Sequence, residues 1–248
     1  MVVRNVTNVS IRDGAVFEGS HLSVGMVLRL IILYIDNITS YQQIRNQCVD
    51  EQDVELSNET VNDWLTYLRE VQLEALVRSS QTKIGGPNCT VEIDESKFGK
   101  RKYNRGRVFE GQWVVGGICR ETGETFVALC PDNKRDSTTL MSIIEQHVDE
   151  RSTVITDCWK AYCQLEQDNW CHLTVNHSLN FVDPTTGAHT LNIENMWWQM
   201  KRNLPSTHGG NLLLHFAQYL WRRKFDGTNV HLCTTFLQHI SDIYPSRN

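Results

Sequence analysis

The sequence predicts an α/β (α+β) protein, in which a mixed β-sheet flanked by helices follows a small helical domain. Three observations lead to this fold class. Apolar residues keep a helix-like spacing through most of residues 21–78, and the breaker Gly85-Gly86-Pro87 ends that region. Short alternating apolar runs follow, as is typical of strands. Helix-like spacing then returns toward the end of the chain. At 248 residues with 40% hydrophobic content, the chain is long enough for one large domain or two modest ones.

Charge and composition narrow the classes of function. The chain carries 24 Lys and Arg against 29 Asp and Glu, a formal net charge of −5, which argues against a uniformly basic nucleic-acid binder but allows local basic patches. The amino terminus has no signal-peptide character, and the most apolar stretch, residues 24–35, is too short to span a bilayer. We therefore expect the 8 cysteines to be free thiols in a reducing compartment.

Three helices with short joins are expected over residues 21–84, after an irregular segment over residues 1–20. Ser40, with Gln43 three residues later, has the spacing of a capping box and begins the second helix. The third helix, residues 58–72, carries an i, i+3, i+4, i+7 apolar stripe made of Val61, Trp64, Leu65 and Leu68. Such a unit is typical of a helix-turn-helix-like domain whose last helix lies near DNA. A plain helical bundle is the alternative, because that helix carries more acidic than basic residues.

The region after the breaker alternates strands and helices. Strands are expected at residues 89–95, 111–119, 124–130, 153–156 and 172–175. Helices are expected at residues 137–148, 162–167, 191–203, 210–224 and 229–240, with a loop over residues 177–190. Ser137 is the expected cap of the first of these helices. Three strands, a helix and a further strand is the order of an RNase H-like fold.

Three carboxylates lie at the ends of predicted elements. Asp94 and Asp157 each end an alternating apolar run, and Glu194 opens a helix. Acids in these settings can converge into a cage of hard oxygen ligands that suits Mg²⁺, or two Mg²⁺ ions about 4 Å apart that bind both oxygens of a phosphoryl transfer. Solvated acids at strand ends are the alternative reading. Glu95 adjoins Asp94 but would point to the opposite face of the strand.

Four ordered blocks of residues carry a family resemblance. They are Val91–Lys100, Asp157–Tyr162, Val175–Ser178 and His189–Arg202. In this order they resemble the signature blocks of the Merlin-type DDE transposases, which are related to the ISXO-like transposases of bacterial insertion sequences. The likeness runs over about residues 87–225, and the acid separations, 157 − 94 = 63 and 194 − 157 = 37, fit the family pattern. Residues 87–225 are thus the expected catalytic domain, and residues 226–248 a C-terminal helix and tail.

The resemblance implies a DNA transposase that cleaves DNA strands and transfers them to a target. Asp94 would bridge two Mg²⁺ or Mn²⁺ ions, Asp157 would hold one ion, and Glu194 would hold the other. Transposon ends and target DNA would be the partners, with self-association into a homo-oligomer on DNA and no membrane. The location would be the nucleus in a eukaryote and the cytoplasm otherwise.

Basic and imidazole side chains near the acids are the candidate DNA contacts. Six cations form a basic finger between the first two predicted strands: Lys97, Lys100, Arg101, Lys102, Arg105 and Arg107. The finger would contact the DNA backbone, with a solvated hairpin as the alternative. His177 and His189 would contact a phosphate or the leaving oxygen, or hold the loop before Glu194. Lys201 shares a helix face with Glu194 and would touch DNA or end in solvent.

Two departures leave further readings open. Many relatives carry a zinc ribbon ahead of this region, but Cys48 is the first cysteine here, so the ribbon is truncated or lost and terminal-repeat recognition is in doubt. Zinc could also be held by Cys158, Cys163, Cys171, His172 and His177, but their spacings fit no zinc framework, and buried thiols are expected. Trp197 and Trp198 are expected in the core. A transposase-derived, catalytically inactive DNA-binding protein and a stand-alone RNase H-like nuclease are the alternatives.

Overall fold

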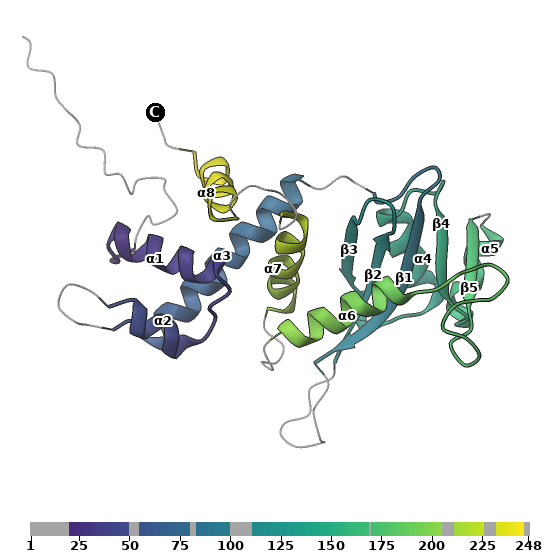
Figure 1. The fold of residues 1–248 in the computed structure, drawn as a ribbon, viewed down its shortest axis with the longest axis horizontal. Helices are drawn as coiled ribbons and strands as arrows, with labels where there is room; N and C mark the ends of the chain where they lie inside the picture. The colour runs from purple at the N-terminus through teal and green to yellow at the C-terminus, as the bar shows by residue number, and fades with distance from the viewer. Residues whose placement is uncertain are drawn as a thin grey trace, which may run out of the picture. The chain divides into compact units, whose positions relative to one another are not determined.

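The structure, a computed structural model, describes residues 20–49, 55–79, 83–99, 111–168, 170–204, 211–225 and 232–245 (Figure 1). The chain divides into two compact units. One unit comprises Met1–Ser79 with Leu220–Asn248, and the other comprises Ser80–Tyr219. The C-terminal segment thus belongs to the unit that begins the chain. The irregular segment predicted for residues 1–19 lies outside the described residues.

The helical unit is built from α1 (Val24–Ile35), α2 (Tyr41–Gln47), α3 (Asn58–Ser79), the end of α7 (Leu212–Phe225) and α8 (Leu232–Ile243). Its core includes an i, i+3, i+4, i+7 stripe of α1: Val27, Leu30, Ile31 and Tyr34. Trp221 of α7 and Phe236 of α8 complete that core with a T-shaped contact at 5.5 Å. Burying these apolar faces against one another is what stabilises such short helices.

Two details of this unit differ from the predictions. Ser40 stands at the N-cap of α2, but its side chain makes no capping hydrogen bond, so the predicted capping box is wrong. α3 continues to Ser79, well past the predicted end at residue 72. The continuation is amphipathic, because Val71 and Ala75 keep the buried stripe going. DNA reading by this unit stays a prediction.

A five-stranded mixed sheet forms the centre of the second unit. Its strands are β1 (Thr90–Phe98), β2 (Gln112–Cys119), β3 (Thr125–Leu129), β4 (Thr153–Asp157) and β5 (Cys171–Val175). They lie in the order β3-β2-β1-β4-β5, with β1, β2 and β3 antiparallel and β1, β4 and β5 parallel. This strand order, with helices on both faces, is that of the RNase H-like fold, and the predicted fold class is confirmed.

The two faces of the sheet pack against different helices (Figure 1). On one face, Val91 and Ile93 of β1 join a core with α4 (Ser137–His147). The 3₁₀ helix η2 (Lys160–Tyr162) and α5 (Cys163–Gln167) pack against the same core. A further 3₁₀ helix, η1 (Pro131–Asn133), precedes α4. On the other face, Phe98 joins a core with α6 (Leu191–Asn203) and the start of α7. Side chains alternate along β1, and the strand therefore serves both cores.

α6 approaches the sheet closely at Gly116 of β2. A Cβ atom there would lie 2.6 Å from the ring of Trp197, so only glycine leaves room for the indole. Trp197 is buried as predicted, but Trp198 is 58% exposed and stacks with Arg202 at 5.2 Å, so the prediction that both tryptophans are in the core is wrong for Trp198. Adjacent helix residues differ by about 100° in direction, and only one of the two can face the sheet.

The ends of two elements also differ from the predictions. Asp136, and not Ser137, caps α4, because its side chain accepts a hydrogen bond from the Thr139 amide at 2.9 Å. β1 runs to Phe98, three residues beyond the predicted end, and this places Lys97 within the strand. Among the described residues, no helix is long and apolar enough to cross a membrane.

Candidate active site

Asp94 and Asp157 lie on the same face of neighbouring parallel strands. β1 and β4 pair in register, with Glu92 opposite Ile155. Continuing that register by two residues sets Asp94 beside Asp157 at the end of β4. Directly paired residues of parallel strands share a face, and alternation from Glu92 puts both acids on the face that α6 covers. This register agrees with the prediction from the sequence that Asp94 and Asp157 lie close together.

Glu194 reaches the same face from the first turn of α6, held by a short chain of hydrogen bonds. The Thr190 hydroxyl donates to Glu194 Oε1 at 2.8 Å, and His177 Nε2 lies 2.8 Å from the same hydroxyl. The hydroxyl has one proton, which goes to Glu194, so it accepts from His177 Nε2–H. His177 Nε2 also lies 3.3 Å from Glu194 Oε1. The histidine therefore holds the carboxylate and the loop before α6 together.

The charges of Asp157 and Glu194 act on Asp94, although the oxygens of the three acids do not all lie within 4.8 Å of one another in this structure. Burial is the largest cause that raises the pKa of Asp94, from 3.8 to about 7, and the negative charges of Glu95, Asp157 and Glu194 raise it further. A backbone hydrogen bond from Glu95 opposes the shift in part. A carboxylate whose charge is opposed by its neighbours in this way favours either a proton or a metal cation.

Glu95 faces the other side of the sheet, as strand alternation predicts. Tyr162 donates its hydroxyl to Glu95 Oε2, and Arg135 Nη1 lies 3.1 Å from Oε1. The Arg135 guanidinium sits 4.0 Å from the Trp113 ring and 4.4 Å from the Trp159 ring, which orients it toward Glu95. Burial first, and then the charge of Asp157, raise the pKa of Glu95, while the Tyr162 and Arg135 contacts lower it. Both oxygens of Glu95 thus have partners on the side of the sheet that α4 covers.

Glu92 is an acid that reasoning from the sequence missed. Its side chain is 0% exposed and lies two residues before Asp94 on the same face. Arg120 Nε donates to it at 2.6 Å, Asn192 donates its backbone and side-chain amides at 2.9 and 2.7 Å, and the Ile193 amide donates at 3.1 Å. The carboxylate thus satisfies backbone N–H groups left free at the start of α6. The sequence signal that could have identified Glu92 is its position as a charged residue within an otherwise apolar run.

Some of the other predicted DNA-binding residues, namely Lys97, Lys201 and His189, lie among the described residues. Lys97 Nζ lies 5.4 Å from the Trp113 ring centroid, and Lys201 Nζ lies 5.4 Å from that of Phe98. The carbonyl of His189 accepts from Arg120 Nη2 at 2.7 Å, and its Nδ1 lies 3.4 Å from Glu92 without a hydrogen bond. The rest of the predicted basic finger lies outside the described residues: Lys100, Arg101, Lys102, Arg105 and Arg107. DNA contact by any of these side chains stays a prediction.

The cysteines are free, but several are not buried. Cys158, Cys163 and Cys171 are exposed, so the expectation of buried thiols is wrong for these three. Cys158 follows the end of β4, Cys163 begins α5, and Cys171 begins β5, the last strand of the sheet order. Within the part of the chain that the structure describes, they do not gather with His172 and His177 into a group of metal ligands.

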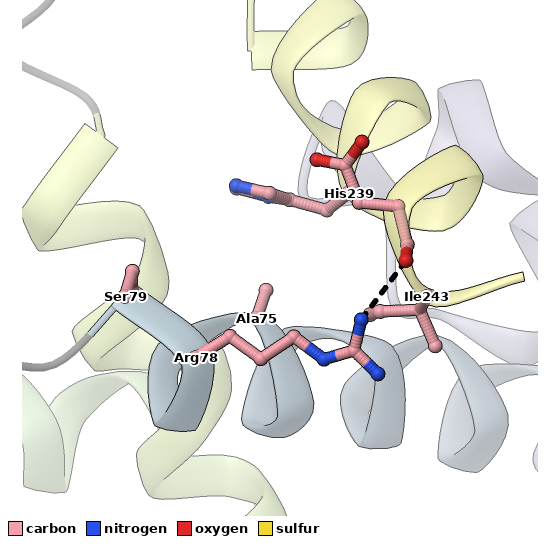
Figure 2. Close-up of a pocket in the computed structure, with 6 residues that line it drawn as sticks. Ala75, Arg78, Ser79, His239 and Ile243 are labelled. Carbon is pink, nitrogen blue, oxygen red and sulfur yellow. Dashed lines mark hydrogen bonds between the residues drawn. The ribbon is translucent and has the colours of Figure 1, made fainter. Parts of the chain in front are cut away.

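A pocket of about 190 Å³ lies in the helical unit, between α3 and α8 (Figure 2). Arg78, which lines it, donates to the Asp242 carbonyl at 2.9 Å and to the Glu74 carboxylate at 2.7 Å. None of the predicted catalytic or DNA-binding residues lines this pocket. Its two charged side chains already have partners, because Asp242 also accepts from Gln238 Nε2 at 2.8 Å.

The family of the chain follows from its sequence. A profile of the ISXO2-like transposase domain matches residues 72–226, more than half of the chain. The chain belongs to this family. The match contains the strands and helices that carry all three acids, and the resemblance found in the ordered blocks is confirmed. An uncharacterized transposase-like protein of Haemophilus influenzae is 33% identical over 90 residues, which are 35% of this chain and 71% of that protein.

Two solved structures are distantly similar to this ISXO2-like chain. The HTLV-2 integrase catalytic core domain in complex with magnesium is 17% identical, with 62% of this chain and 96% of that one covered and a TM-score of 0.30. A simian T-cell lymphotropic virus intasome in complex with the PP2A regulatory subunit B56 gamma is 14% identical, with 75% and 58% covered and a TM-score of 0.29. At such low TM-scores the fold assignment rests on the strand order instead.

Proposed function

We propose that this member of the ISXO2-like family is a DNA transposase that cleaves and transfers DNA strands with Asp94, Asp157 and Glu194 as its catalytic acids. The observation that carries the proposal is the register of β1 and β4, which sets Asp94 beside Asp157 on the face that α6 covers. Burial first, and then the charges of Glu95, Asp157 and Glu194, raise the pKa of Asp94, which agrees with acids from β1, β4 and α6 lying near one another. A protein that needed these acids only for folding would pair them with cations, as it pairs Glu92 with Arg120.

The donor set fits a divalent metal. Three carboxylates on one face supply the hard oxygen ligands that Mg²⁺ and Mn²⁺ take, and the repulsion felt by Asp94 would be relieved by a bound cation. Asp94, Asp157 and Glu194 would hold the metal, with two ions as the number that strand cleavage and transfer suggest. When bound, the metal makes water or a DNA 3′-hydroxyl a better nucleophile and neutralises the leaving oxygen.

The chain's own residues position that chemistry. Thr190 and His177 fix the direction of the Glu194 carboxylate, and Glu92 fixes the start of the helix that carries it. Lys97, Lys201 and the basic residues between β1 and β2 would contact the DNA backbone, where Lys and Arg neutralise phosphates. Transposon ends and target DNA are the proposed substrates, and a homo-oligomer on paired ends is the proposed working form.

A nicking and strand-transfer assay tests the proposal. Duplex DNA carrying the terminal inverted repeats that flank the gene is incubated with the purified protein and Mg²⁺ or Mn²⁺. We expect Asp94→Asn, Asp157→Asn and Glu194→Gln each to lose about 10³-fold or more in cleavage rate, because each removes one member of a catalytic unit. Glu145→Gln changes an exposed acid of α4 and is the matched control.

The assay also separates the alternatives. If Asp94→Asn nicks DNA as fast as the parent, the assignment of the catalytic acids is wrong. If the parent binds the repeats but never nicks them with either metal, the chain is a transposase-derived DNA-binding protein. Nicking without any joined product would identify a nuclease instead of a transposase.

A further inference from the structure

A second group of ligand-type side chains lies at the start of β1, away from the catalytic acids. It consists of Cys89, Cys119 and Glu121, whose two Sγ atoms and one carboxylate oxygen all lie within 4.8 Å of one another. Within the group, Cys119 Sγ is 3.5 Å from Glu121 Oε2. Cys89 precedes Asp94 by five residues, which corresponds to roughly 16 Å along a strand. The group is therefore a separate site.

The register of the sheet explains why these three side chains meet. β1 and β2 are antiparallel, and just beyond the ladder the Arg120 amide donates to the Thr90 carbonyl at 2.9 Å. The continued register sets Cys89 opposite Glu121, and Cys119 lies two residues before Glu121 on the same face. This is the face covered by α4, because Cys119 is buried in that core, whereas Arg120 points to the opposite face and binds Glu92.

Hydrogen bonds hold the backbone on both sides of the group. The Cys89 carbonyl accepts from the Thr153 amide at 2.9 Å, and its amide donates to Gly86 at 3.1 Å. The Cys119 carbonyl accepts from the Gly123 amide at 2.9 Å in the tight turn between β2 and β3. The ligand atoms are therefore presented by backbone that is fixed before any ion binds, which reduces the free-energy cost of binding.

Glu121 is held in the same way. Its Oε2 accepts from the Thr90 amide at 2.7 Å, so the carboxylate bends back over β1 although the residue is on the surface. Oε2 is thereby placed beside Cys119 Sγ. An exposed glutamate with no such constraint would be free to extend into solvent.

The distances suit tetrahedral zinc. Zn–S and Zn–O bonds of about 2.3 and 2.1 Å at tetrahedral angles require S···O and S···S separations of about 3.6 and 3.8 Å. The distance of 3.5 Å between Cys119 Sγ and Glu121 Oε2 meets the first requirement. The two sulfur atoms lie within 4.8 Å of each other, which allows the second. Two thiolates select Zn²⁺ over Mg²⁺, which takes oxygen ligands.

Binding of the ion would require both thiols to lose a proton. A divalent cation at this position would displace the two thiol protons to solvent, and the two thiolates and the Glu121 carboxylate would surround it.

We propose that Cys89, Cys119 and Glu121 bind one Zn²⁺ ion, with water as the fourth ligand. The ion fastens the residue before β1 to the turn between β2 and β3, on the opposite side of the sheet from α6. None of the proposed catalytic acids lies in the group, so the ion would tie these segments together and take no part in the proposed DNA chemistry. The inference does not depend on the proposed transposase activity.

Metal analysis of the full-length protein tests this site. The reduced protein is given zinc, freed of excess by gel filtration and measured for bound zinc per chain. We expect about one ion in the parent, a near-complete loss in Cys89→Ser and in Cys119→Ser, and full retention in Cys158→Ser, which alters an exposed cysteine elsewhere. Circular dichroism of each variant establishes that loss of zinc is not loss of fold.

A measurement on the unaltered parent completes the test. Titration with Cd²⁺ should produce the ultraviolet thiolate-to-metal band at one equivalent, and that band should be absent from Cys119→Ser. The inference is overturned if the reduced parent binds no zinc and shows no Cd²⁺ band. It is also overturned if both serine variants bind as much zinc as the parent, or if Cys158→Ser alone loses the ion.

Discussion

Glu92 and Asp94 are two acids on the same face of the same strand, two residues apart, and their surroundings are opposite. Glu92 is fully buried and receives hydrogen bonds from Arg120 and from the first turn of α6. Asp94 is less buried than Glu92, yet burial first, and then the charges of Glu95, Asp157 and Glu194, raise its pKa to about 7. Burial alone therefore does not make a carboxylate reactive. The difference lies in whether the fold supplies donors for the charge or leaves it for a metal ion or a proton.

The largest expected effect concerns Glu92 and stability. Glu92→Ala should lower the free energy of unfolding by about 3–5 kcal/mol, because Arg120 and the amides that start α6 lose a buried partner. Urea denaturation followed by tryptophan fluorescence measures the change. Glu145→Ala on α4 is the control and should stay within about 0.5 kcal/mol of the parent. An unchanged urea midpoint for Glu92→Ala would show that the comparison is mistaken.

The next effect concerns the hydrogen bonds that aim Glu194. Thr190→Val keeps the shape of a buried side chain but removes the hydroxyl that joins His177 to Glu194. On the proposed function, the Mg²⁺-dependent nicking rate should fall about 10–100-fold, as when a group that orients a metal ligand is lost. Thr185→Val, on the exposed part of the same loop, is the control. Equal rates for the two variants would rule out an orienting role for Thr190.

The raised pKa of Asp94 predicts how metal dependence changes with pH. Below about pH 7 the carboxyl group holds a proton that Mg²⁺ must displace, so apparent Mg²⁺ affinity should rise with pH by up to about tenfold per unit and level off above pH 7. Mg²⁺ titrations of nicking at several pH values from 5.5 to 8.5 measure this. A Mg²⁺ requirement that does not change over that range would contradict the assigned environment of Asp94.

The smallest expected effect is a gain in stability from removing Asp94's charge. Its folded-state pKa is raised, so the ionised form opposes folding, and stability is lost as pH rises from about 4 through about 7. Asp94→Asn removes the buried charge and, in metal-free buffer, should therefore raise the melting temperature at pH 8 by about 2–4 °C for each kcal/mol regained, and change it little at pH 4. Differential scanning calorimetry with Glu145→Gln alongside provides the measurement. A lower melting temperature for Asp94→Asn at pH 8 would refute it.

The sequence predicted best those features that depend on residues close together along the chain. Alternating apolar residues predicted the strands of the sheet, and the same alternation placed Asp94 and Glu95 on opposite faces. It failed where partners come from distant parts of the chain. Glu92 looks like any charged strand residue until Arg120, about 30 residues later, and Asn192, 100 residues later, donate to it. Cys89 and Cys119 were missed as a pair because their spacing matches no zinc motif, although the register of β1 and β2 brings them together.

The sequence by itself determined the family of this chain, its order of strands and helices, and the choice of three acids to propose as catalytic. Each of these depends on residue types at short range and on ordered blocks. Only the tertiary structure decided what surrounds each acid. It gave Glu92 a set of donors, bound Glu95 to Tyr162 and Arg135, and left Asp94 among other negative charges. The physical reason is that the free energy of a carboxylate depends on solvent access and on the charges and donors within a few ångströms. Pairing of strands and packing of helices determine these neighbours, whatever their separation along the chain.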